Sequence, residues 1–354
     1  MHRTIAVLVL AGLVVLAGCA AEDPGSDDPL ADDTSTPATD GSVEGTLEIH
    51  AINVGQADAT LIIAPSGETI LIDTGDWRDD GGTVIDYLEA HDIDRIDHLV
   101  ATHAHADHIG GHAAIIEHYE EEKDGIGTAW DSGVPHDSQT YENYLDAIEE
   151  YDVTLFDAQE GDEIPVEGIQ AEILNPPAES EQPDDLHYNS LTVHVQHGEV
   201  TFLSTGDAED AAEARMTDEY GDELAADIYH AGHHGSDTSS TEEFLAAVDP
   251  DAAIISAAYD SQFGHPHEEV LERFDEHGID AYWTGIHGTI VFVSDGETVT
   301  VETQTDATTE PLDLRDEPET DADPADPTEQ RGQLSVVGDP ATVPAELAPV
   351  PVVA

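Results

Sequence analysis

The stretch 101-ATHAHADHIGGH-112 places His103, His105, Asp107 and His108 within one short segment. Imidazole and carboxylate groups cost free energy when they are buried without partners, so such crowding indicates a shared ligand. The apolar run before the stretch predicts a strand ending near residue 102, and a loop beyond a strand end lets side chains converge. We therefore expect His103 and His105 to bind one metal ion and the Asp107–His108 pair to face a second. The competing interpretation is a solvated polar loop in a chain with 20 histidines.

One loop cannot supply all the ligands of a two-metal site, so further ligands should follow other strands. The best candidates come after apolar runs, in turns that contain glycine. They are Asp73 in LIDTGD, Asp207 in FLSTGDAE, and His233 and His234 in AGHHGSDTSS. A single aspartate before a turn usually caps that turn. Several such positions in one chain, together with the histidine stretch, favour metal binding instead.

The rest of the folded region alternates between short apolar runs and helical stretches. Residues 46–55, 59–65 and 69–76 have the pattern of three successive strands joined by tight turns. Further strands and helices alternate along the second half, without an exact internal repeat. This order predicts an α/β fold in which two sheets pack together between two layers of helices.

The charge of the chain is extreme, because 8 Lys plus Arg stand against 80 Asp plus Glu, for a formal net charge of −72. Self-repulsion of this size weakens a compact state, but at molar salt the Debye length falls to about 3 Å and the repulsion is largely screened. The composition is therefore typical of proteins from extreme halophiles. It also argues against a nucleic-acid surface built from basic side chains.

The N-terminus predicts export. Two polar residues, His2 and Arg3, precede an apolar run over residues 5–17 that is short for a membrane span but typical of a secretory signal. The run ends in LAGC, which resembles the lipobox of exported lipoproteins. We therefore expect residues 1–18 to be removed and a lipid on Cys19 to anchor the chain to the outer face of the cytoplasmic membrane. A signal cut elsewhere, or an uncleaved anchor, is the alternative.

Composition also predicts the remaining boundaries. Residues 19–44 are acidic and rich in Pro, Ser, Thr and Gly, which predicts a disordered tether. Residues 45–305 have the size of one layered α/β domain. Residues 306–354 return to low complexity, and we expect disorder there, although QLSVV could add an edge strand. Cys19 is the only cysteine, which excludes an intramolecular disulfide and a thiolate ligand in the folded domain.

The order of four motifs, LIDTGD, THAHADHIGG, STGDAE and GHHGS, resembles the metallo-β-lactamase superfamily. INVGQADATLI, HHGSDTSS and GHPHEEVLERFDEHGI narrow the resemblance to the branch of competence-protein ComEC C-terminal domains and their stand-alone relatives. The resemblance spans residues 47–301 and implies a four-layer αββα sandwich with two divalent metal ions, zinc or manganese. The resemblance implies that His103 and His105 bind metal one and that Asp107 and His108 bind metal two. Asp207 would bridge the two ions.

The resemblance also implies roles around these ligands. One of His233 and His234 would complete the second site; we favour His234 as the ligand and His233 as the group that faces the substrate, with the reverse order left open. Asp107 would also accept a proton from the attacking hydroxide. Asp73 would orient the histidine stretch through hydrogen bonds.

One position departs from the pattern of the family. Many members have another histidine on the strand before the bridging aspartate, where this chain reads LHYNSLTVHV. Asn189 matches the ComEC-like branch, so Asn189 or water would complete the first metal site, with His187 as a substitute two residues away. His265 in GHPH is either a turn residue or part of the substrate site. The remaining histidines are expected on the surface or in strands: His112, His118, His194 and His197.

The chemistry that the resemblance implies is hydrolysis by a hydroxide held between two metal ions, acting on a phosphodiester, DNA included. The negative charge favours a small phosphodiester, or a lipid- or wall-linked phosphoester, over long nucleic acid. The alternatives are a phosphocholine-type esterase, another hydrolase of the same fold, and a non-catalytic surface lipoprotein that binds metal. No protein partner can be inferred.

Overall fold

The computed structural model describes residues 45–335, so the expected signal segment, Cys19 and the tether lie outside the described residues. The first of two sheets has nine strands in the order β15-β14-β13-β1-β2-β3-β4-β5-β6. These strands are β1 (Leu47–Ala51), β2 (Thr60–Ile63), β3 (Thr69–Ile72), β4 (Ile96–Ala101), β5 (Ile126–Asp131), β6 (Thr154–Asp157), β13 (Ile290–Ser294), β14 (Thr298–Thr303) and β15 (Glu329–Ser335). Strands β3 to β6 are parallel, so the loops that follow them leave from one edge of the sheet.

The second sheet has six strands in the order β12-β11-β10-β9-β8-β7. They are β7 (Gln170–Asn175), β8 (Thr192–His197), β9 (Val200–Ser204), β10 (Ile228–His230), β11 (Ala252–Ile255) and β12 (Asp280–Trp283). Strands β9 to β12 are parallel, which brings the loops after them to a common edge as well. Ligands of α/β proteins bind at such carboxyl ends of strands.

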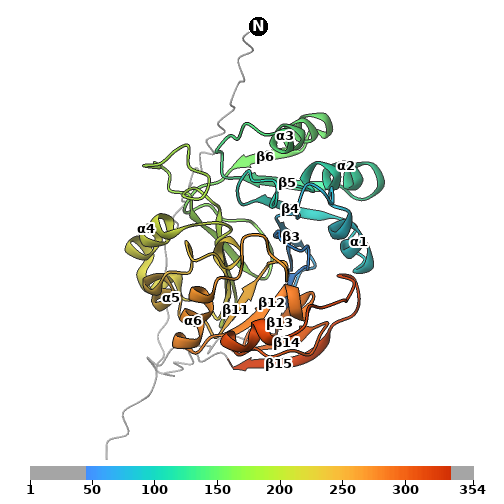
Figure 1. Ribbon diagram of the computed structural model, residues 1–354. Helices are drawn as coiled ribbons and strands as arrows, with labels where there is room; N and C mark the ends of the chain where they lie inside the picture. The colour runs from blue at the N-terminus through green and yellow to red at the C-terminus, as the bar shows by residue number, and fades with distance from the viewer. Residues whose placement is uncertain (1–44, 336–354) are drawn as a thin grey trace, which may run out of the picture. The chain divides into compact units, whose positions relative to one another are not determined.

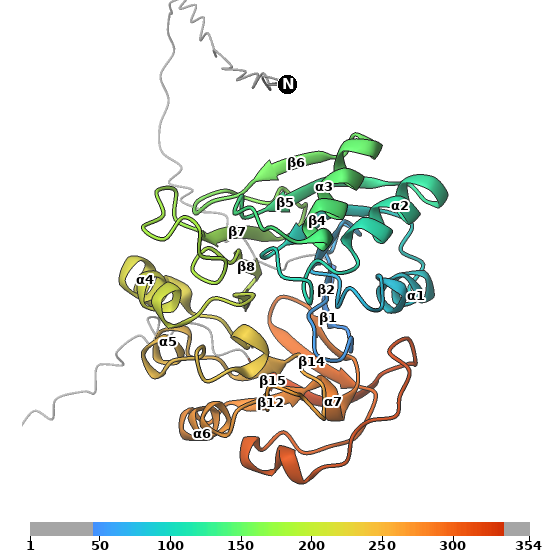
Figure 2. The same ribbon diagram turned by 45° about the horizontal axis from the view of Figure 1, so that its top comes forward.

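Helices cover the outer face of each sheet (Figures 1 and 2). The nine-stranded sheet carries α1 (Gly82–Ala90), α2 (His112–Glu122) and α3 (Gln139–Tyr151), and the six-stranded sheet carries α4 (Asp210–Tyr220), α5 (Glu242–Val248) and α6 (Glu268–His277). Short helical segments complete the set: α7 (Thr284–His287), η1 (Gly221–Leu224), η2 (Gly232–Gly235) and η3 (Pro311–Asp316). The expected four-layer αββα sandwich is confirmed.

The alternation of side chains along the strands explains the layers. In β3, Ile70 and Ile72 are buried between the two sheets, whereas Leu71 between them is buried against the helices. In β9, Phe202 is buried between the two sheets and Leu203 is buried against the helices. Successive side chains of a strand point to opposite faces, so a strand covered on both faces is a nearly continuous apolar run.

The C-terminal boundary differs from the expectation. Expected disorder is not what the structure has between residues 306 and 335, because η3 buries Pro311 and Leu314. β15 pairs antiparallel with β14 and includes residues 333–335 of QLSVV, where an edge strand was the alternative (Figure 1). A segment of polar composition can dock through a few apolar anchors and through backbone hydrogen bonds to an open strand edge. Residues 336–354 lie outside the described residues. Within residues 45–335, no helix combines the length and the apolar character needed to cross a membrane.

Two leucines of η3 test whether this segment belongs to the core. Leu314 is 0% exposed and packs among the residues of α4, α5 and α6, whereas Leu312 is 52% exposed. We expect Leu314→Ala to lower the free energy of unfolding by about 2–5 kcal/mol, because it leaves a cavity. Leu312→Ala should change it by less than about 0.5 kcal/mol. Denaturant unfolding at high salt measures both, and equally small effects would contradict the packing of this segment.

Candidate metal centre

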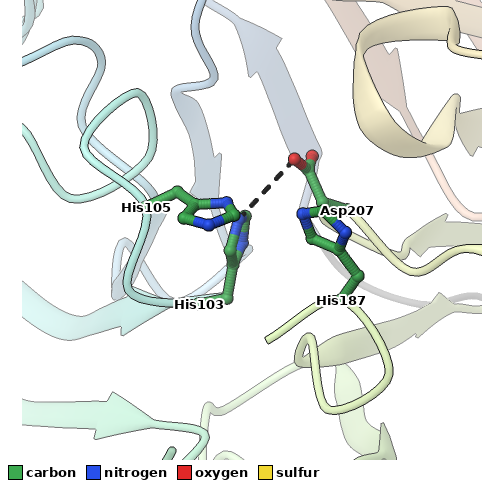
Figure 3. Close-up of side chains that lie close together, drawn as sticks. All are labelled: His103, His105, His187 and Asp207. Atoms are coloured by element: carbon green, nitrogen blue, oxygen red, sulfur yellow. Dashed lines mark hydrogen bonds and ion pairs between the residues drawn. The ribbon is translucent and has the colours of Figure 1, made fainter. Parts of the chain in front are cut away.

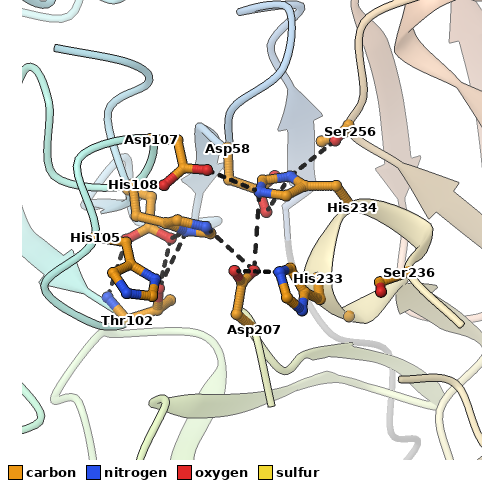
Figure 4. A network of polar contacts seen from close by, with 12 residues as sticks. Asp58, Thr102, His105, Asp107, His108, Asp207, His233, His234, Ser236 and Ser256 are labelled. Atoms are coloured by element: carbon orange, nitrogen blue, oxygen red, sulfur yellow. Dashed lines mark hydrogen bonds and ion pairs between the residues drawn. The ribbon is translucent and has the colours of Figure 1, made fainter. Parts of the chain in front are cut away.

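The candidate site lies where the loops after β3, β4, β9 and β10 meet at the seam between the two sheets (Figure 4). The nine-stranded sheet contributes Asp73 and the histidine stretch, and the six-stranded sheet contributes Asp207 and the His233–His234 pair. Because these loops leave the carboxyl ends of neighbouring parallel strands, residues far apart in sequence converge here.

Asp73 anchors the histidine stretch through three hydrogen bonds. Its Oδ1 accepts one from the Thr102 amide at 2.9 Å, and its Oδ2 accepts one each from the Thr102 hydroxyl and from Nδ1 of His108, both at 2.7 Å. The Thr102 hydroxyl oxygen also lies 3.2 Å from Nδ1 of His103. Protons held on Nδ1 leave Nε2 of His103 and His108 as the ligand atoms, so Asp73 orients both rings.

The first group of candidate ligands is His103, His105, His187 and Asp207, whose ligand atoms all lie within 4.8 Å of one another (Figure 3). Nε2 of His103 is 2.9 Å from Nδ1 of His105 and 3.6 Å from Oδ2 of Asp207. Three imidazoles and a carboxylate are a donor set that suits zinc, iron or manganese. A divalent cation fits this group.

The second group gathers around the other oxygen of Asp207. Oδ1 of Asp207 is 3.1 Å from Nε2 of His108 and 3.9 Å from Nε2 of His234, and Oδ2 of Asp107 is 3.5 Å from Nε2 of His234. Three atoms of this group, His108 Nε2, His234 Nε2 and Asp207 Oδ1, are buried and have no hydrogen-bond partner. Buried polar atoms without partners are costly, so their convergence indicates a cation site.

The two consecutive histidines of η2 point in different directions. His233 and His234 both have left-handed backbone angles, with φ of 50° and 58°. His234 is 2% exposed, and its Nδ1 donates to the Ser256 carbonyl at 3.0 Å, which leaves Nε2 for the second group. The His233 side chain is 23% exposed, with Nδ1 3.2 Å from Oε1 of Glu209. The arrangement favours His234 as the ligand and His233 as the group open to substrate.

Behind His234 lies a further polar layer. Nε2 of His230 is 2.9 Å from the Ser256 hydroxyl and 3.1 Å from Oδ1 of Asp58. Asp58 is also close enough to His108 and His234 to share a cation with them. Although burial opposes it, His230 and His234 lower the pKa of Asp58 to about 2. An ionised, buried carboxylate therefore supports the second group from behind.

The charges of the cluster set the pKa values of its histidines. Burial lowers the pKa of His103 far below its ordinary value and that of His105 to about 4. Burial acts in the same direction on His108, but Asp207 and Asp73 outweigh it and raise the pKa of His108 well above its ordinary value. Against burial, Asp207 and Asp107 likewise raise the pKa of His234 to about 9. His108 and His234 therefore hold protons at neutral pH that a cation must displace.

The structure brings most of the predicted site residues together, and Asn189 is the exception. The side-chain amide of Asn189 donates to the carbonyls of Gln182 and Asp185, at 2.7 and 2.6 Å, so it holds the preceding loop instead of reaching the metal group. His187 lies in the first group of candidate ligands instead of Asn189. The two residues belong to an irregular loop, where a separation of two residues in sequence does not set how far apart the side chains lie. His265 is buried, at 6% exposure, and its ring centroid is 5.8 Å from that of His233.

Sequence reasoning missed several residues around the site. Asp58 and Glu209 stand inside the quoted motifs INVGQADATLI and STGDAE, which was the only signal for them. His112, expected on the surface or in a strand, is instead buried at the start of α2, with Nδ1 2.7 Å from the Thr74 hydroxyl. Contacts of this kind depend on the packing of loops from different strands.

Comparisons with known proteins find a family and relatives that are similar to this chain. The family model described as the metallo-beta-lactamase superfamily matches residues 52–259. ComE operon protein 3 of Bacillus subtilis is 31% identical over 261 residues, which cover 69% of this chain and 33% of that protein. Competence protein ComA of Neisseria gonorrhoeae is 29% identical over 233 residues, covering 66% and 30%. The chain thus spans about a third of the length of these relatives.

A solved structure with a similar fold is the metallo-beta-lactamase fold protein YhfI from Bacillus subtilis. It is 11% identical to this chain, with a TM-score of 0.45, over 68% of this chain and 96% of that one.

The raised pKa values of His108 and His234 predict how cation binding depends on pH. Both histidines must lose a proton to become ligands, so affinity for Zn²⁺ or Mn²⁺ should rise with pH; the contribution of His234 should level off near its pKa of about 9. The expected slope is about tenfold per pH unit for each displaced proton. Calorimetry in buffers of different ionisation enthalpy counts the protons released. The His234→Gln variant should release one proton fewer on cation binding. The control variant, His118→Gln in α2, should release as many protons as the parent protein. A cation affinity that does not depend on pH would contradict the assignment.

Proposed function

This chain belongs to the metallo-beta-lactamase superfamily, and on that premise we propose that it is a hydrolase of phosphodiester bonds that uses two divalent metal ions, zinc or manganese. One observation carries the proposal. Asp207 lies between two groups of histidines and turns one oxygen toward each, Oδ2 toward His103 at 3.6 Å and Oδ1 toward His108 at 3.1 Å. A carboxylate so placed suits a bridge between two cations.

The residues divide into those that would hold the ions and those that would act on the substrate. His103, His105 and His187 would hold the first ion, and Asp107, His108 and His234 the second. Such a pair of ions, when bound, activates water near neutral pH and neutralises the charge of a phosphodiester. Proton transfer and hydrogen bonding to the substrate would be carried out by side chains that the substrate can reach.

Asp107 and His233 are partly exposed, as are His105 and His187, and they are the two partly exposed members that we assign to the substrate side. The Asp107 side chain is 32% exposed, and against burial His234 and His108 hold its pKa below the ordinary value, so it stays ionised and can accept the proton of an attacking water. Burial lowers the pKa of His233, so this ring is neutral near pH 7. Held by Glu209, neutral His233 can donate a hydrogen bond to a phosphate or leaving-group oxygen.

His265 is a buried neighbour of His233, with its ring centroid 5.8 Å away. Burial and the nearby His234 lower its pKa to about 4, so it too is neutral near pH 7. A neutral imidazole here can form a hydrogen bond with the substrate without adding charge. The relative named as a competence protein supports DNA among the substrates. A metal carrier would not need accessible groups such as Asp107 and His233 beside its ligands.

Turnover of bis(p-nitrophenyl) phosphate at high salt tests the proposal. We expect hydrolysis to need Mn²⁺ or Zn²⁺ and to stop in chelator. Asp107→Asn should lower kcat by about 10²–10⁴-fold, the usual contribution of a positioned acid or base. His233→Gln should lower kcat while elemental analysis still finds both ions, and His118→Gln should have neither effect. Hydrolysis of a β-lactam without any diesterase activity, or two bound ions with no hydrolysis at all, would overturn the assignment.

The proposal includes export and a lipid anchor at Cys19, which rest on the LAGC motif. Cys19→Ser removes the only thiol that can carry the lipid. The variant should therefore appear in the medium or accumulate as an uncleaved precursor. Fractionation of cells and medium measures this, and unchanged membrane retention with normal processing would exclude the anchor.

A further inference from the structure

Arg315 of η3 donates its hydrogen bonds to backbone carbonyls rather than to a carboxylate. Its Nη2 donates to the Gly264 carbonyl at 2.8 Å and to the Pro266 carbonyl. No carboxylate within residues 45–335 pairs with Arg315, whereas four of the other five arginines in that range have such a partner. A charged donor binds a carbonyl more strongly than a neutral donor does. The two carbonyls flank His265, so Arg315 fixes the backbone on both sides of that residue.

η3 presents Arg315 from a fixed position. The preceding residue, Leu314, is buried in the apolar cluster that α4, α5 and α6 share. Beyond Arg315, the Glu317 carbonyl accepts a hydrogen bond from the Tyr259 hydroxyl at 3.1 Å. Because Tyr259 belongs to the loop between β11 and α6, which also contains Gly264, η3 is tied to that loop at two points. A backbone held on both sides of Arg315 restricts the guanidinium, so its hydrogen bonds cost less conformational entropy.

The loop that Arg315 holds packs directly on η2. The His267 amide, at the end of this loop, donates to the Gly235 carbonyl at 2.8 Å. Gly235 has a left-handed φ of 77°, and a Cβ on it would lie only 2.8 Å from Cβ of Pro266. The close approach therefore requires a glycine, and no side chain separates the two loops. Gly235 directly follows His234, so the position of this candidate ligand depends on the loop that contains Pro266.

The His265 side chain forms a second contact between the same loop and η2. Its ring centroid lies 5.8 Å from that of His233 and 6.2 Å from that of His234, and the ring stacks on the second at an interplanar angle of 25°. On the side of the β1–β2 loop, Nδ1 of His265 is 3.4 Å from Nε2 of Gln56. His265 is buried, and in a close-packed interior it cannot move without its neighbours. A displacement of the loop would therefore reach both histidines of η2.

We infer that Arg315 is a positioning residue of the metal centre. Its guanidinium fixes the loop of residues 264–267, and this loop holds η2 and its two histidines in place. The consequence for turnover rests on the proposed function, in which His233 contacts the substrate. An arginine suits this role because its planar group can donate to two carbonyls at once. The segment after β14, whose composition is that of a disordered tail, thereby takes part in shaping the site.

Hydrogen exchange measured by mass spectrometry tests this transmission without depending on catalysis. At high salt and with Zn²⁺ or Mn²⁺ present, Arg315→Met should speed amide exchange in residues 232–237 about tenfold, because charge-assisted hydrogen bonds that support them are lost. Residues 306–314 should keep their protection, since Leu314 still anchors η3. Arg331→Met removes the same charge from β15 and is the matched control, which should exchange like the parent protein. Faster exchange that stays outside residues 232–237 would overturn the inference.

Turnover of bis(p-nitrophenyl) phosphate shows whether the positioning affects the reaction. Arg315→Met should lower kcat about tenfold at an unchanged metal content, since a small misplacement of a reacting group is costly. Arg315→Lys keeps a charged donor that can reach one carbonyl, so its kcat should lie between those of Arg315→Met and the parent protein, and Arg331→Met should have no effect. An unchanged kcat in Arg315→Met would overturn the inference and leave the proposed function standing. If the parent protein hydrolyses no diester, the proposed function fails, and exchange in residues 232–237 still decides the inference.

Discussion

The carboxylate of Asp73 is the interaction on which the rest of the centre depends. It accepts three hydrogen bonds at the point where β3 ends, and all of them come from the neighbouring parallel strand and its loop. Through Thr102 and His108 it fixes the start and the end of the ligand-bearing segment. Asp73 has a left-handed φ of 57°, a conformation that a non-glycine residue adopts at a cost unless its surroundings determine it. The three hydrogen bonds hold Asp73 in this conformation, so the same contacts that maintain the strained backbone also orient the candidate ligands.

The parts of this architecture that were predictable from the sequence are those written in local patterns. The alternating runs, the histidine stretch and the aspartates after apolar runs predicted the layers and the convergence of ligands, and the expected family is confirmed. The features that the sequence did not predict depend on packing between loops that are distant in sequence. Asn189 satisfies carbonyls of its own loop, and that loop carries His187 to the metal group. No spacing rule relates Asp58 to His234, because the contact exists only after the two sheets pack together.

Composition misled in one place for a physical reason. The segment after residue 305 is polar enough to suggest disorder, yet Leu314 and Leu334 are buried and β15 pairs along β14. The average composition of the segment does not show that two leucines, Leu314 and Leu334, are buried in the core. The excess of acidic residues is a feature of the whole chain, whereas the candidate ligand imidazoles are concentrated at the seam between the sheets.

The seam between the sheets also constrains how the chain reaches its folded state. Candidate ligands come from loops that follow β4, β9 and β10, so a cation that contacts Asp207, His108 and His234 fastens both halves of the chain at once. Such contacts are non-local and close late, which slows folding of this kind of topology. A cation bound there acts as a reversible cross-link, and its binding free energy adds to the free energy of unfolding. A metal ion bound at this seam would therefore make the folded fraction of the chain depend on the metal concentration.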